Sequence, residues 1–102
     1  MIVVCTGDTS ASTRQDALFS IRKPILVATM DPLWYMTADR MSLPRCFFGN
    51  KLKMMRFVLK NDNRAIMLGV DHDGNPETWE MIASFHAMGV DVWKVMHSKE
   101  AE

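Results

Sequence analysis

Short apolar runs, separated by polar segments, dominate the pattern of this chain. Residues 2–5, 24–29 and 64–70 each contain a continuous run of β-branched and other apolar side chains, and turn-forming residues bound each run. Runs of this length without polar alternation predict strands that are buried on both faces. Residues 90–96 predict a fourth strand.

Most of the segments between these runs have apolar residues at helical spacing. The segments 10–21, 51–60 and 76–88 predict three helices, with small polar caps before the first and Gly89 as a stop after the last. The residues expected to face the core are Ala11, Leu18 and Ile21 in the first helix, Leu52, Met55, Val58 and Leu59 in the second, and Trp79, Ile82, Ala83 and His86 in the third.

Residues 30–50 carry the weakest pattern, because Pro32 and Pro44 interrupt the segment. We expect a long loop there, with one turn of helix around 34–41. In the rest of the chain strands alternate with helices, which predicts one α/β domain over residues 1–102. The expected architecture is a small three-layer Rossmann-like domain with a mostly parallel sheet of about four strands.

Composition and charge narrow the class of protein. The chain has 102 residues, of which 48% are apolar, and its 12 basic residues balance 12 acidic ones. The sequence starts without a secretion signal and has no apolar span of about 18 residues, so we expect a cytoplasmic protein without a membrane partner and with reduced Cys5 and Cys46. Because the net charge is balanced, contact with nucleic acid would need a local basic surface. The candidate is the helix face that carries Lys51, Lys53, Arg56 and Lys60.

The candidate chemistry starts where the first strand ends. Small polar residues lead from this strand into the first helix, and small residues let an anion approach the backbone N–H groups of a helix N-terminus. Cys5, at the strand end, is a candidate nucleophile if its pKa is lowered there. The same residues also suit a buried strand end and a plain helix cap. The expected ligand-binding residues are Cys5, Thr6, Gly7, Asp8, Thr9, Ser10, Ser12, Thr13 and Arg14.

The segment VCTGDTSASTRQDALF, residues 4–19, resembles the phosphate loop of low-molecular-weight tyrosine phosphatases and their arsenate-reductase relatives. The resemblance implies that Cys5 is the nucleophile, that Asp8 stands where the family has Asn, and that Ser12 assists the thiolate. However, the position of the family's catalytic Arg holds Ala11, and Arg14 follows about one helical turn later. That Arg clamps the phosphoryl oxygens, so the departure implies binding without efficient catalysis.

A second candidate site follows the third predicted strand. Asp71 and Asp73 offer carboxylate oxygens of the kind that Mg²⁺ prefers. Residues 65–96 resemble the second half of Toprim domains of primases and topoisomerases, although Thr6 stands where that family needs a Glu. The same segment is more loosely similar to nucleoside deoxyribosyltransferases, which implies Glu77 or Glu80 as the attacking group. A solvated turn is the alternative interpretation of the two aspartates.

Three hypotheses about function remain open. The first is a Rossmann-like domain that binds a phosphate-bearing small molecule or a nucleotide without efficient catalysis. The second is a non-catalytic interaction protein, for example a small viral or mobile-element protein that binds a host factor through an exposed apolar surface around Trp34 and Phe48. The third is an enzyme, either a divergent phosphatase or an Mg²⁺-dependent nucleotide-handling domain.

Overall fold

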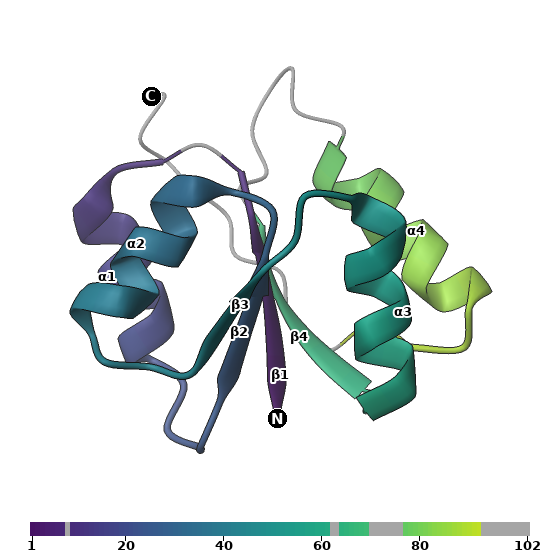
Figure 1. The fold of residues 1–102 in the computed structure, drawn as a ribbon, viewed down its shortest axis with the longest axis horizontal. Coiled ribbons are helices and arrows are strands. Elements are labelled where there is room, and N and C mark those ends of the chain that lie inside the picture. Colours follow the sequence, from purple (N-terminus) through teal and green to yellow (C-terminus); the bar gives the residue numbers. More distant parts are fainter. Residues whose placement is uncertain (8, 62–63, 70–76, 93–102) are drawn as a thin grey trace.

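The computed structural model describes residues 1–7, 9–61, 64–69 and 77–92 of the chain (Figure 1). Strands and helices alternate throughout these residues. Their order is β1 (Ile2–Thr6), α1 (Ala11–Phe19), β2 (Leu26–Thr29), α2 (Pro32–Arg40), β3 (Arg45–Phe47), α3 (Lys51–Asn61), β4 (Arg64–Gly69), α4 (Glu77–Ala87) and β5 (Asp91–Val92).

The strands form a single parallel sheet in the order β3-β2-β1-β4-β5. Helices α1 and α2 cover one face of this sheet, and α3 and α4 cover the other (Figure 1). The predicted α/β class and the three-layer arrangement around a parallel sheet are therefore confirmed. Strand β3, at the edge, is an addition that the apolar pattern did not predict.

Strand β1 lies in the middle of the sheet and supplies both cores. Ile2 and Val4 join the apolar cluster under α3 and α4, whereas Val3 and Cys5 join the cluster under α1 and α2. Successive side chains of a strand point to opposite faces, so a strand covered on both sides needs an apolar residue at every position. This requirement explains the continuous apolar run with which the chain begins.

Residues 30–50 are more ordered than we expected. In place of a long loop with one helical turn, they form the nine-residue helix α2 and strand β3. The side chain of Asp31 accepts a hydrogen bond from the backbone N–H of Leu33 at 2.8 Å, and Pro32 occupies the first turn. An Asp cap followed by Pro is a helix start signal, and Trp34, Thr37 and Ala38 then form the buried face.

Strand β3 forms the edge of the sheet and has only three residues. Val27 pairs with Arg45 and Thr29 with Phe47, which directs both β3 side chains to the α2 side of the sheet. The Phe47 ring meets Tyr35 of α2 edge-on, with the ring centroids 5.8 Å apart. An edge strand this short offers little backbone for pairing with another chain.

The predicted buried faces of α3 and α4 are confirmed only in part, at Met55, Val58 and Ile82. In α3 the buried residues are Met54, Met55 and Val58, and the expected core residues Leu52 and Leu59 are about half exposed, at 50% and 41%. In α4 the buried residues are Met81, Ile82 and Phe85 rather than Trp79, Ala83 and His86. Both helices carry apolar residues on more than one face, so spacing alone did not identify the side that meets the sheet.

Two helices end in the same backbone motif. After α4, Gly89 N–H donates to the His86 carbonyl at 3.1 Å and Val90 N–H to the Phe85 carbonyl at 2.9 Å. After α2, the corresponding bonds run from Ser42 to Asp39 and from Leu43 to Ala38, at 3.0 Å each. The motif needs a left-handed residue directly after the helix, and Gly89 (φ +86°) and Ser42 (φ 56°) occupy that position.

We predict that Gly89→Ala lowers the free energy of unfolding by about 1 kcal/mol, because a Cβ disfavours the left-handed conformation. An added Cβ meets no atom within 4 Å at Gly89, so the cost comes from the backbone alone. Gly49→Ala is the matched control, since Gly49 has equal space and no positive φ. Urea unfolding measures both variants, and equal losses would contradict the prediction.

The opposite substitution should stabilise the end of α2. Ser42→Gly is expected to raise the free energy of unfolding by about 0.5 kcal/mol, because relief of the left-handed strain exceeds the extra entropy of glycine in the unfolded chain. Ser42→Ala keeps the strain and removes only the hydroxyl, so it should leave the urea midpoint unchanged. A gain in the alanine variant as well would show that the hydroxyl, and not the backbone, is responsible.

Candidate functional site

The order of the strands marks one position at the carboxyl edge of the sheet. From β1 the chain adds β2 and β3 on one side and then crosses back to place β4 on the other side of β1. In open parallel sheets, ligands bind beyond the carboxyl ends of the strands at such a reversal. The connections 7–10 and 70–76 start there, and the structure describes only the first, apart from residue 8.

The β1–α1 connection turns sharply into its helix. Gly7 has a φ of 96°, which favours glycine, and Ser10 is the N-cap of α1. The Ser10 hydroxyl accepts a hydrogen bond from the backbone N–H of Thr13 at 3.1 Å. Ala11 and Ser12 are exposed and occupy the first two helical positions, where the helix itself offers no partner for the backbone N–H.

Side chains from other elements hold this connection in place. The indole Nε1 of Trp34 donates to the Gly7 carbonyl at 2.9 Å, and an Nη of Arg14 donates to the Thr9 carbonyl. Two residues before Gly7, in strand β1, the Cys5 carbonyl accepts a hydrogen bond from the Thr29 hydroxyl at 2.7 Å. Of these bonds, the one from Trp34 joins α2 to the connection, so the shape of the connection depends on how α2 packs against it.

Arg14 is the charged centre of this arrangement. Its side chain is only 7% exposed, and its Nε donates to the Thr37 hydroxyl of α2 at 3.0 Å. Both recorded partners are uncharged oxygens, and among the residues that the structure describes no ion pair is recorded for Arg14. Because no described residue supplies a counter-charge, this buried cation favours a positive potential beneath the N-terminus of α1.

The other predicted ligand residues are distributed over the same corner. Thr6, Gly7, Thr9 and Thr13 are half-buried there, and Ser10 and Ser12 are exposed. The expected contribution of Asp8 lies outside the described residues. The structure therefore brings together every described member of the predicted set, but Arg14 lies beneath the surface rather than at the mouth of the loop.

Cys5 does not have the environment of a nucleophile. Its side chain is 1% exposed and packs in the apolar cluster with Val3, Leu18 and Trp34. Burial raises the pKa of the thiol far above its ordinary value of 9.0, and the nearby charge of Asp31 raises it further. The expectation of a lowered pKa at the helix N-terminus is thus wrong, because desolvation exceeds the effect of the helix dipole.

The second candidate site cannot be placed in the same way. Asp71, Asp73 and His72 lie outside the described residues, so the predicted Mg²⁺ site stays a prediction. Within residues 1–7, 9–61, 64–69 and 77–92, no group of three His, Cys, Asp or Glu side chains could hold a metal ion. Glu77 begins α4, and Glu80 and His86 are exposed on that helix.

The sequence also predicted two contact surfaces, a basic face on α3 and an apolar surface around Trp34 and Phe48. The basic residues Lys53, Arg56 and Lys60 of α3 are exposed and Lys51 is half-buried, so their place on an outer helix face agrees with the expectation, and contact with nucleic acid stays a prediction. The expected apolar patch around Trp34 and Phe48 is formed by neighbouring side chains instead: Leu33, Met36 and Phe47 are about half exposed, and contact of this surface with a partner stays a prediction. Trp34 is fully buried, and Phe48 packs against the core beside Phe57.

Sequence reasoning missed the residues that hold the loop. Trp34 and Thr37 lie one turn apart on the inner face of α2, and they contact Gly7 and Arg14 respectively. A usable signal was present, since the Asp31-Pro32 start and the apolar spacing after it predict a helix with Trp34 inside. The partners of Trp34 and Thr37 were beyond prediction, because the bonds join residues more than twenty positions apart.

The pKa of Cys5 predicts how stability depends on pH. Below pH 9.0 the thiol is protonated in both the folded and the unfolded chain, so its full contribution to stability is present. Above pH 9.0 the unfolded chain loses the proton first, and the free energy of unfolding should fall by up to about 1.4 kcal/mol per pH unit. Urea unfolding between pH 7 and 10.5 measures this effect. Above pH 9.0 the free energy of unfolding should fall less steeply with pH for Cys5→Ala than for the original protein. An equal fall in both proteins would contradict a raised pKa.

Comparison with known proteins does not assign the chain to a family. The chain matches no protein-family model, and neither a curated protein nor a solved structure is significantly similar to it. In the part of the chain that the structure describes, no helix is long and apolar enough to cross a lipid bilayer. The functional assignment therefore depends on the site itself.

Proposed function

We propose that this protein binds a phosphate-bearing small molecule or a nucleotide at the β1–α1 connection, and that it does not turn the ligand over efficiently. The observation that carries the proposal is Arg14, a buried guanidinium whose recorded partners are a carbonyl and a hydroxyl. No described carboxylate pairs with Arg14, and an anion above it would supply a counter-charge. The backbone N–H groups of Ala11 and Ser12 would supply the direct hydrogen bonds.

The position of the connection supports the same function. It begins at the strand where the sheet order reverses, which is where parallel α/β domains place their ligands. The small side chains of Gly7, Ser10 and Ala11 leave the backbone open to approach. Because Trp34 and Arg14 fix two of the carbonyls, little entropy of the loop would be lost when a ligand binds.

The chemistry of the site argues against efficient turnover. Covalent phosphoryl transfer through Cys5 needs the thiolate, and the pKa of Cys5 is raised by burial in the apolar cluster. Arg14 reaches Thr37 and Thr9 instead of the space above the loop, so it cannot clamp phosphoryl oxygens as a surface guanidinium does. What remains is electrostatic attraction and backbone hydrogen bonds, which bind an anion without activating it.

We predict that inorganic phosphate or ATP stabilises the protein and that Ala11→Pro weakens this binding about tenfold or more. Proline is well suited to the first helical position, and the extended backbone of Ser10 (ψ 156°) accepts a proline after it, so the helix should remain intact. The substitution removes one N–H donor, and a hydrogen bond to a charged group is worth about 1.5–3 kcal/mol. Isothermal titration calorimetry at constant ionic strength measures the effect.

A second pair of variants tests the charge. Arg14→Met should also weaken phosphate binding, whereas Arg56→Met, on the exposed outer face of α3, removes the same charge and should not. Circular dichroism checks that each variant folds. The proposal fails if neither phosphate nor ATP binds the original protein, or if Ala11→Pro and Arg56→Met affect binding equally.

A further inference from the structure

A hollow of about 320 Å³ opens at the opposite edge of the sheet, where the strands begin. The end of α1, the start of β2 and the turn between α2 and β3 surround it. Its apolar lining consists of Leu18, Phe19, Ile21, Ile25, Met41 and Leu43. This hollow shares no residue with the β1–α1 connection, so the inference below does not depend on the proposed function.

Phe19 extends the apolar surface of the hollow into solvent. Its side chain is 72% exposed, the largest exposure of any large apolar side chain among the described residues. Leu18, its neighbour in α1, is 2% exposed and already anchors the helix to the sheet. The fold therefore does not need the Phe19 ring for packing, and an exposed aromatic ring beside an apolar hollow is typical of an interaction surface.

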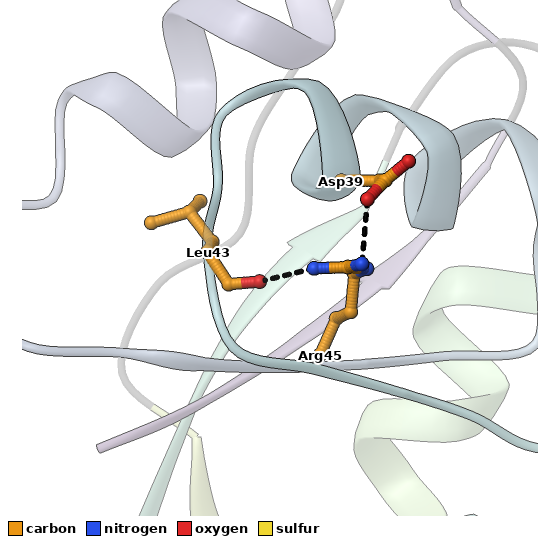
Figure 2. Close-up of polar contacts among 3 residues, drawn as sticks. All are labelled: Asp39, Leu43 and Arg45. Atoms are coloured by element: carbon orange, nitrogen blue, oxygen red, sulfur yellow. Dashed lines mark hydrogen bonds and ion pairs between the residues drawn. The ribbon is translucent and has the colours of Figure 1, made fainter.

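The charges at the rim have one sign. Arg22 and Lys23 line the hollow, and none of the described residues that line it is acidic. The acidic residue on the last turns of α2, Asp39, is paired with Arg45 at 2.5 Å, so its charge is already compensated (Figure 2). A partner that presents carboxylates around an apolar group would match this surface in both charge and polarity.

The far wall of the hollow is fixed before any partner arrives. The backbone N–H of Leu43 donates to the Ala38 carbonyl at 3.0 Å, and an Nη of Arg45 donates to the Leu43 carbonyl at 3.0 Å. Figure 2 shows the Leu43 carbonyl directed at Arg45, with its side chain on the other side of the backbone. A wall held from behind in this way loses little freedom on binding.

We propose that this hollow docks a segment of a partner protein in which an apolar anchor side chain is flanked by carboxylates. The volume is at the lower end of the roughly 300–1,000 Å³ of small-molecule pockets, and it suits a single side-chain anchor. Phe19 and the lining residues would bury the anchor, and Arg22 would meet the flanking carboxylates. An anchor in a pocket with charges at its rim is the usual arrangement of a binding hot spot.

The test uses a short fluorescein-labelled peptide in which Phe and Leu are spaced among Glu residues, with fluorescence anisotropy as the readout. We expect micromolar binding that weakens as salt is raised, and no binding of a matched peptide with Lys in place of Glu. Phe19→Ser and Arg22→Glu should each weaken binding at least tenfold. Leu59→Ser and Arg56→Glu are the matched controls on the exposed side of α3 and should change binding less than twofold.

Three outcomes would overturn the proposal. The peptide could fail to bind at about 1 mM, well above the affinity expected for a specific contact. The α3 controls could weaken binding as much as Phe19→Ser does, which would indicate general attraction. Size-exclusion chromatography could show a dimer that Phe19→Ser converts to a monomer, in which case a second copy of the chain occupies the hollow.

Discussion

The burial of β1 on both faces is the constraint on which the rest of the structure depends. Val3 and Val4 point to opposite cores, and both are fully buried. A strand in this position needs a helical layer on each side and a neighbouring strand on each edge, which β2 and β4 provide. The candidate site follows from this arrangement, because the central strand is also the one at which the strand order reverses.

The sequence predicted those parts of the fold that local patterns encode. Continuous apolar runs identified β1, β2 and β4, and the Gly89 stop was identified because its conformation is a local requirement. The faces of α3 and α4 were identified only in part, at Met55, Val58 and Ile82, since each helix has more apolar residues than it buries. Strand β3 was missed for a different reason: with only three residues at the sheet edge, it forms because β2 and α2 hold it, not because of its own composition.

In the candidate site, too, locally encoded features were predictable and features that depend on tertiary packing were not. The small residues of the β1–α1 connection and the Ser10 cap are visible in the sequence, and the structure brings them together. The bonds from Trp34 to Gly7 and from Arg14 to Thr37 were not predictable, because they depend on how α1 and α2 pack. The pKa of Cys5 depends on packing as well: a strand-end cysteine in a small-residue loop suggests a thiolate, and only its burial shows that the thiol stays protonated.

Arg14 has an energetic consequence for the whole domain. A chain of this size has a net stability of only about 5–15 kcal/mol, and burying a guanidinium costs part of it. The bonds to Thr9 and Thr37 recover some of that cost, but neither partner carries a charge. An apolar side chain of similar volume would avoid the cost altogether. Under the proposed function, the charge of Arg14, which no described residue compensates, makes the ligand-free protein less stable than it could be. An anion that binds above α1 would recover that lost free energy, because Coulomb attraction is stronger in a partly buried site than in water.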